Sequence, residues 1–348
     1  MTRVKRLLRS TILSLVLVIT AAEAQWKLEP SLHALVLSGI DLILKQEYDR
    51  ADSLFCEVAK KHPYHPAGFL YQAAVMQAYA IDVDVPIGRQ KFDSLLERGK
   101  MTAAGLDSPW REFFLATADG YDAFERVERG DWLGGIRKAM ASASTYEQIV
   151  QKDSSFYDAY IGIGTYQYWR SRKTAFIRWL PFVRDDRELG IKMLIAGAER
   201  SEYSRSTAIS ALISIYLDAE KYQDVEKWAK RGLDLYPENR VFLWGLATAL
   251  DRQRNVVSAI EAYSVLLENI LHAKFPHPYS EMVCRLNLSK CRLTVQDTAS
   301  VAAHLLRILS YEKTSFPANL QSRAQAKFDE AKTLLFSVNN HRKVIQER

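Results

Sequence analysis

Two neighbouring stretches of this chain carry the same pattern of apolar and small residues, 34 residues apart. The first begins at Ser206 and the second at Arg240, and each is typical of two amphipathic helices joined by a short turn. The pattern comprises Ile209, Leu212, Ile213, Tyr216, Tyr222, Val225, Ala229 and Gly232 in the first stretch, and Leu243, Leu246, Ala247, Leu250, Val256, Ala259, Tyr263 and Leu266 in the second. A period of this length indicates stacked helical hairpins, in which each hairpin buries its apolar face against its neighbours.

The same spacing returns near the N-terminus and in the middle of the chain, and it resembles the tetratricopeptide repeat (TPR). Family units carry small residues where their two helices cross and end in a proline, as Gly39 and Pro63 do here. Two helices approach closely only where a side chain is short. We therefore expect an all-α fold, a right-handed superhelical solenoid of antiparallel helix pairs; an ordinary helical bundle is the alternative. The expected parts are a repeat array over 25–296, with its clearest units at 32–65, 157–205 with an insert, 206–239 and 240–273, and capping helices and a tail over 297–348.

The first 24 residues have the organisation of an export signal. Met1 to Arg9 is cationic, Thr11 to Ala22 is almost wholly apolar, and Ala22-Glu23-Ala24 has the small-x-small form of a cleavage site. The apolar run is shorter than the roughly 20 residues that span a bilayer comfortably. The sequence predicts a cleaved signal peptide ending at Ala24 and a periplasmic or secreted protein, with an uncleaved anchor as the alternative.

The net charge argues against a nucleic-acid-binding protein, and the cysteine spacing argues against a disulfide-stabilised fold. The chain carries a formal charge of +6, and removal of residues 1–24, with four basic and one acidic side chain, leaves about +3. Such a weak charge without a basic stripe argues against nucleic-acid binding. Cys284 and Cys291 lie seven residues apart in one expected helix, on the order of 10 Å, too far apart for a disulfide. We therefore expect packing, not disulfides, to stabilise the fold.

No constellation of catalytic or metal-ligating residues stands out. His62 and His65 share one turn and His272 and His277 flank another, but no carboxylate or cysteine completes a metal set at ligand spacing. There is also no nucleophile elbow of the G-x-S-x-G type. We expect a protein that is not an enzyme and that carries no metal or cofactor.

An aromatic and basic insert over residues 166–184 interrupts the second clear unit, 157–205. The order of Gly162-x-Gly164-x-x-x-Tyr168, an apolar stretch with Leu180-Pro181, and Asp186-Arg187-Glu188-Leu189-Gly190 is similar to part of the eukaryotic Iml2 and tetratricopeptide-39 group. That resemblance implies a repeat fold and no chemistry. Three interpretations of the insert remain: its aromatic residues fill a gap between helices, it forms a lip that grips a partner, or it contacts a membrane surface, the least favoured of the three.

The resemblance to TPR arrays implies a concave binding surface formed by the first helix of each pair. The candidate residues on that face and in the insert are apolar, aromatic or hydroxyl-bearing, with little charge. They are Thr165, Tyr168, Trp169, Arg170, Trp179, Ser210, Ser214, Trp244, Thr248 and Asp251. The function predicted from them is an exported adaptor that binds a protein or peptide partner. The alternative is a protein that binds a glycan or lipid in a pocket made by the insert.

Overall fold

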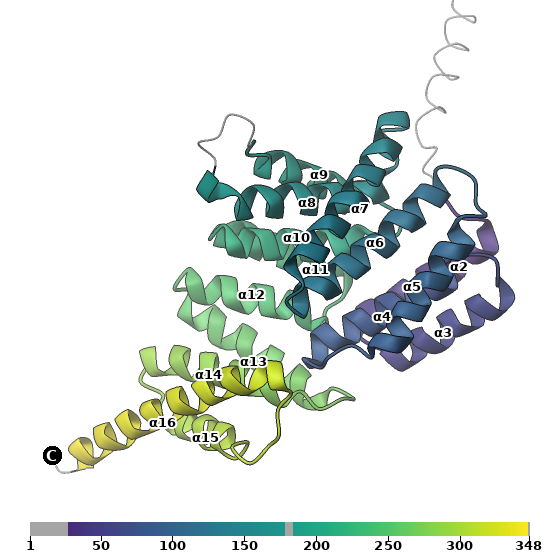
Figure 1. Cartoon of the computed structure of the whole chain (residues 1–348). Coiled ribbons are helices and arrows are strands. Elements are labelled where there is room, and N and C mark those ends of the chain that lie inside the picture. The colour runs from purple at the N-terminus through teal and green to yellow at the C-terminus, as the bar shows by residue number, and fades with distance from the viewer. Residues whose placement is uncertain (1–26, 178–183, 347–348) are drawn as a thin grey trace, which may run out of the picture.

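The protein is an all-α solenoid of helix pairs, as the repeat spacing predicts (Figure 1). The computed structural model describes residues 27–177 and 184–346, and within those ranges the regular structure is entirely helical. Each helix packs chiefly against the helices next to it in the chain. Seven helix pairs, α2–α3 to α14–α15, succeed one another in this described part, and α16 closes the series.

Fifteen α-helices, α2 to α16, make up the regular structure of the described residues, together with two short 3-10 turns. Their bounds are α2 Pro30–Leu44, α3 Tyr48–Lys61, α4 Ala67–Val83, α5 Arg89–Ala103, α6 Trp110–Glu128, α7 Trp132–Lys152, α8 Tyr160–Lys173, α9 Arg187–Arg200, α10 Arg205–Asp218, α11 Tyr222–Leu235, α12 Arg240–Arg252, α13 Val256–His272, α14 Pro278–Thr294, α15 Thr298–Leu309 and α16 Ala318–Gln346. Short 3-10 turns lie at Tyr157–Ala159 and Ala175–Ile177. The stretch 67–152, which contains none of the clearest repeat units predicted from the sequence, forms two further pairs, α4–α5 and α6–α7.

One turn geometry recurs between the two helices of a pair. The residue after the C-cap adopts a left-handed conformation, and the next N–H donates to the carbonyl five residues earlier, at 2.8 to 3.1 Å. This is the Schellman arrangement, which satisfies carbonyls left open at a helix end. The left-handed residues are Gln46, Gly130, Glu220, Arg254 and Gln296. The repetition of one turn at five hairpins is independent evidence that the units are structural repeats.

Small residues let the helices of a pair approach closely. A Cβ on Gly39 of α2 would lie 2.2 Å from the Phe55 ring of α3, so only a glycine admits that ring. Gly164 of α8 and Gly190 of α9 face each other in the same way, because a Cβ on Gly164 would lie 2.6 Å from the Gly190 oxygen. The sequence expectation that small residues mark close crossings is correct at these positions.

The buried apolar residues form four successive clusters along the solenoid. The last cluster joins α14 to α15 and α16 and includes Phe316, Leu320 and Phe328. Cys284 and Cys291 are free thiols inside α14, and burial raises the pKa of each to about 12. They behave as small apolar groups and are not poised to react. Within the described residues no helix combines the length and apolar character needed to cross a bilayer.

The N-terminal pairs fold back onto the later part of the solenoid, which the sequence does not predict. Helix α2 lies across the starting ends of α10 and α12: the Tyr203 hydroxyl accepts a hydrogen bond from the Leu28 N–H at 2.9 Å, and Asn239 Nδ2 donates to the Leu44 carbonyl at 2.8 Å. The end of α4 reaches α14, where His277 Nδ1 donates to the Asp82 carbonyl at 3.1 Å. The array is thus braced by contacts nearly 200 residues apart in the chain.

Candidate partner-binding surface

The predicted face on α10 and α12 is present but mostly half-buried. Ser214 is exposed, whereas Ser210, Trp244, Thr248 and Asp251 are each partly covered. The Trp244 ring packs edge-on against Tyr263 of α13, with ring centroids 6.3 Å apart, so this tryptophan contributes to packing. Of the predicted residues on these two helices, only Ser214 is fully accessible to a partner.

The predicted residues of α8 and the insert divide between core and surface. Tyr168 is 1% exposed, and its hydroxyl donates to Asp218 of α10 at 2.8 Å, which makes it a core residue and removes it from a binding surface. Trp169 and Thr165 are half-buried, and Trp169 packs against the second core cluster. Arg170 is exposed and pairs with Asp186.

The structure therefore favours gap-filling for the aromatic residues that begin the insert. The rings of Tyr168 and Trp169 pack edge to face, with centroids 5.3 Å apart, where α8 meets α10. Arg172 pairs with Asp218 at 2.8 Å, so this arginine also serves the packing of α8 on α10. Trp179 lies outside the described residues.

Among the residues whose burial is described, the most exposed group of large apolar side chains lies on α7, where the sequence predicts no site. Trp132, Leu133, Ile136 and Met140 are 53%, 78%, 55% and 52% exposed. At 100° per residue they fall within an arc of about 100° on one side of the helix. We call these four residues the α7 surface. The helical spacing of these four apolar residues is visible in the sequence WLGGIRKAM, residues 132–140. On a repeat helix, however, that spacing normally indicates a buried face.

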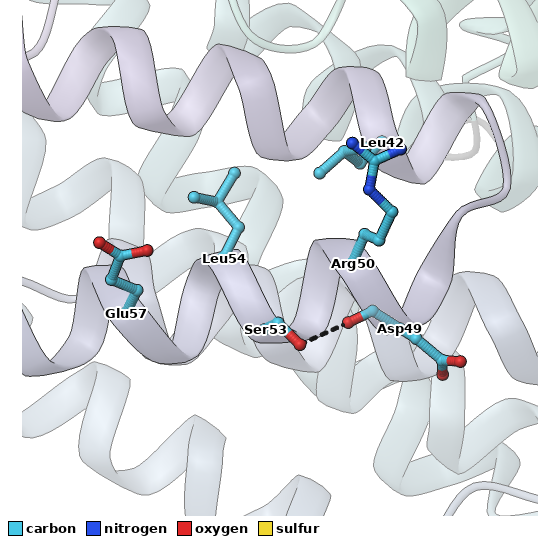
Figure 2. Close-up of a pocket in the computed structure, with 6 residues that line it drawn as sticks. All are labelled: Leu42, Asp49, Arg50, Ser53, Leu54 and Glu57. Atoms are coloured by element: carbon cyan, nitrogen blue, oxygen red, sulfur yellow. Dashed lines mark hydrogen bonds between the residues drawn. The ribbon is translucent and has the colours of Figure 1, made fainter.

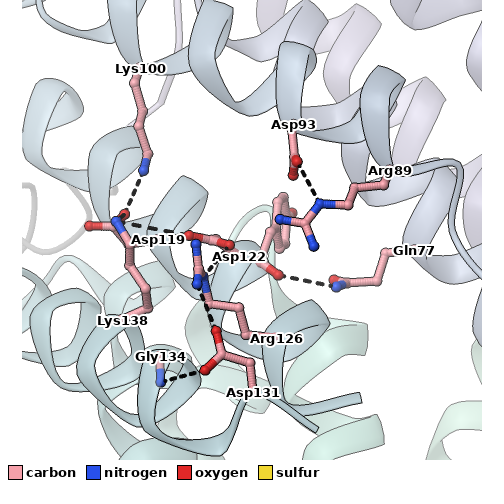
Figure 3. Close-up of polar contacts among 11 residues, drawn as sticks. Gln77, Arg89, Asp93, Lys100, Asp119, Asp122, Arg126, Asp131, Gly134 and Lys138 are labelled. Atoms are coloured by element: carbon pink, nitrogen blue, oxygen red, sulfur yellow. Dashed lines mark hydrogen bonds and ion pairs between the residues drawn. The ribbon is translucent and has the colours of Figure 1, made fainter. Parts of the chain in front are cut away.

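A polar network fixes the first turn of α7 (Figure 3). Asp131 caps the helix by accepting from the Gly134 N–H at 3.0 Å, and Arg126 of α6 donates to the same carboxylate at 2.8 Å. These two contacts lower the pKa of Asp131, the backbone hydrogen bond more than the arginine. The cap and its arginine hold the residues that begin the α7 surface in a defined position.

The same network continues along α7 to α5. Asp119 of α6 accepts from Lys100 at 2.6 Å and from Lys138 of α7 at 2.9 Å. Burial by itself would raise the pKa of Asp119, and the two lysines reverse that effect and lower it. The acidic groups at the base of α7 are thus engaged with cations of the protein itself.

Positive charge borders the α7 surface. The exposed side chains of Arg129, Arg137 and Lys173 form no ion pair within the part of the chain that the structure describes. Lys173, at the end of α8, lies with its Nζ 5.8 Å from the centroid of the Trp132 ring. The α7 surface is therefore an apolar strip with a basic border.

Two clefts elsewhere lack the character of a chemical site. One is an open depression on α3, where Arg50 pairs with Glu47 and the Ser53 hydroxyl donates to the Asp49 carbonyl at 2.8 Å (Figure 2). The other, of about 510 Å³, lies between the α2–α3 turn and α12–α13 and is lined by side chains of both charges. Among the described residues no group of three or more His, Cys, Asp or Glu could hold a metal ion.

No protein-family model matches the sequence, and no curated protein sequence matches it. Among solved structures, the chain is similar to the C-terminal part of a TPR repeat-containing protein from Cytophaga hutchinsonii, with 15% sequence identity and a TM-score of 0.41. That likeness covers 84% of this chain and 98% of the other.

Proposed function

We propose that this protein is a non-enzymatic adaptor that binds a protein partner through the α7 surface. The observation that supports this proposal is the exposure of four large apolar side chains on one side of one helix. Contiguous apolar patches are rare on the surfaces of soluble monomers and mark interaction sites. The helix-A face predicted from the sequence becomes the second candidate surface, and the experiment below compares the two.

The energetics of the α7 surface suit an interface. Complete burial of a large apolar side chain contributes about 1.5–3 kcal/mol, so covering each half-exposed residue contributes on the order of 1 kcal/mol. Trp132 has the added character of an interface hot spot, because it combines a large ring with a neighbouring cation, Lys173. A partner that covers all four side chains gains enough apolar contact to define a site.

The alternative of a glycan or lipid pocket in the insert gains no support from the described residues. Tyr168 is buried in the core, and Trp169 lines neither of the two clefts. Deep enclosure of the ligand is a general property of small-molecule sites. A protein partner on an exposed strip is the better explanation of the molecule's surface.

We also propose that the adaptor acts outside the cytoplasm, on the basis of the signal-like residues 1–24. Cleavage after Ala24 gives a mature chain that begins at Gln25. Intact mass measurement of the protein purified from its own cell tests this directly. A mature mass that still includes residues 1–24 would contradict cleavage.

The adaptor function is tested by capture of the partner from the source cell with variant proteins. The test variant carries Leu133→Asp, Ile136→Asp and Met140→Asp, and a second variant carries Ser214→Asp on the helix-A face. A matched control carries Val257→Asp and Leu271→Asp, which alter comparably exposed apolar residues on α13 that do not adjoin each other.

We expect stoichiometric capture of one protein by the wild type, the control and the Ser214 variant, and loss of that protein with the α7 variant. Circular dichroism should show equal helicity for all four proteins, because the altered side chains lie on the surface. Retention of the partner by the α7 variant and its loss with Ser214→Asp would move the site to the helix-A face.

A further inference from the structure

We infer that the partner segment is an amphipathic helix with acidic residues beside its apolar stripe. This inference rests on the proposed function, because it names the chemistry of the segment that covers the α7 surface. Three properties of the surface support it: its shape and length, the absence of backbone groups that could pair with an extended peptide, and the charge of its border.

The α7 surface has the dimensions of a helix contact. Trp132 and Met140 are eight residues apart, and at 1.5 Å per residue the strip is about 12 Å long. That length corresponds to about two turns of a partner helix, which would present anchors at i, i+4 and i+7. A partner cannot extend its contact toward the C-terminal half of α7, because Ala143 and Tyr146 are buried against neighbouring helices.

The backbone of the protein favours a helical over an extended partner. One common way for an extended peptide to gain affinity is to add a strand to a sheet edge. The described part of the chain has no strand, and the N–H and carbonyl groups in the middle of α7 are satisfied within the helix. A partner helix satisfies its own backbone and needs only side-chain contacts from α7.

The charged residues that border the α7 surface determine which charges a partner carries beside its apolar stripe. Arg129, Arg137 and Lys173 are exposed without an ion pair in residues 27–177 and 184–346, whereas the nearby Asp131 is held by Arg126. Glu128 is the exposed acid at the end of α6, so the border still carries an excess of two positive charges. A partner with Glu or Asp beside its apolar stripe complements that excess, and a partner with Lys or Arg is repelled.

The inference is tested with synthetic peptides whose composition is known. Three fluorescein-labelled amphipathic helices share one Leu-rich stripe and differ only in carrying Glu, Gln or Lys beside it. Binding to the mature full chain is measured by fluorescence anisotropy at low and at high salt. Vesicles of an anionic phospholipid serve as the fourth probe, measured by co-sedimentation.

We expect the Glu peptide to bind at least about tenfold more tightly than the Gln peptide at low salt, with the Lys peptide weakest. The difference should shrink at high salt, because exposed charges are screened. The variant Arg137→Glu, Lys173→Glu should reverse the order of the Glu and Lys peptides. The control Lys60→Glu, Lys192→Glu alters two exposed lysines on α3 and α9 and should leave the order unchanged.

Equal affinity for the three peptides, binding of none of them, or binding to vesicles alone would overturn the inference. Failure of the inference is distinguishable from failure of the proposed function. If no peptide shows the charge preference but the triple α7 variant still loses its cellular partner, the adaptor proposal stands without the acidic helix. If the triple variant retains that partner, the α7 surface itself is not the site.

Discussion

The buried ion pair between Asp82 and Arg240 fastens the N-terminal helix pairs to the later solenoid. The two side chains are 6% and 10% exposed, and Arg240 Nε donates to Asp82 Oδ1 at 2.9 Å while Nη2 bonds Oδ2. Arg240 Nη1 also donates to Asn269 Oδ1 at 2.9 Å, and the Tyr48 hydroxyl donates to Asp82 Oδ2 at 3.0 Å. This ion pair and its hydrogen bonds therefore join four helices: α3, α4, α12 and α13.

Replacing Arg240 with alanine should lower the free energy of unfolding by about 3–5 kcal/mol, because it leaves the Asp82 carboxylate buried without a counter-charge. The comparison is Lys61→Ala, which breaks a pair with Glu57 in which both side chains are more than half exposed, and should cost no more than about 1 kcal/mol. Urea unfolding followed by circular dichroism measures both values.

A double variant distinguishes the cost of a buried, unpaired charge from the cost of lost packing. Asp82→Leu with Arg240→Met removes both charges and should cost less than Arg240→Ala alone. Hydrogen exchange should show faster opening of α2–α5 in Arg240→Ala than in the wild type. A loss below about 1 kcal/mol in Arg240→Ala, or no change in exchange of α2–α5, would refute the role of this pair as the fastening.

Three further predictions concern packing, turns and pH. Gly232→Ala should destabilise the protein by about 1–3 kcal/mol in urea unfolding, because its Cβ would lie 2.6 Å from the Phe242 ring, whereas Gly105→Ala, with 3.6 Å of clearance, should be near neutral. Arg254→Gly should stabilise it by up to about 1 kcal/mol in the same assay, since Arg254 has a φ of 61° that an L residue adopts only with strain. Burial lowers the pKa of His65 and of His304 from 6.5 to about 4. The unfolded chain therefore binds protons first on acidification, and unfolding free energy should fall between pH 6.5 and 4, by at most about 3 kcal/mol per histidine. His65→Asn with His304→Asn should flatten that slope in urea titrations across this range; an unchanged slope would contradict the assignment.

Much of the architecture is predictable from the sequence because local signals and repeat spacing agree. The 34-residue period places α10–α11 and α12–α13, and helices expected within 297–348 appear as α15 and α16. Small residues such as Gly39 were identified correctly, because a close helix crossing imposes a direct limit on side-chain size. These features depend on neighbours in the chain.

The remaining features depend on contacts that one sequence does not display. Arg240 has the sequence context of an ordinary helix start, and only the folded chain brings it to Asp82, 158 residues away. Tyr168 was assigned to a binding face, but its register on α8 points it into the packing with α10. Trp132 and Ile136 have the spacing of a core face, yet each is more than half exposed, because no helix in residues 27–177 and 184–346 covers that end of α7.

The most direct test of the adaptor proposal is site-specific photo-crosslinking in the living source cell. A photoreactive amino acid replaces Leu133, at the most exposed position of the α7 surface, and in parallel strains Ser214 or Val257. We predict that position 133 forms a covalent adduct with a single protein, and that positions 214 and 257 do not. Adducts from position 214 alone, or no protein adduct from position 133, would contradict the central claim that α7 carries the partner.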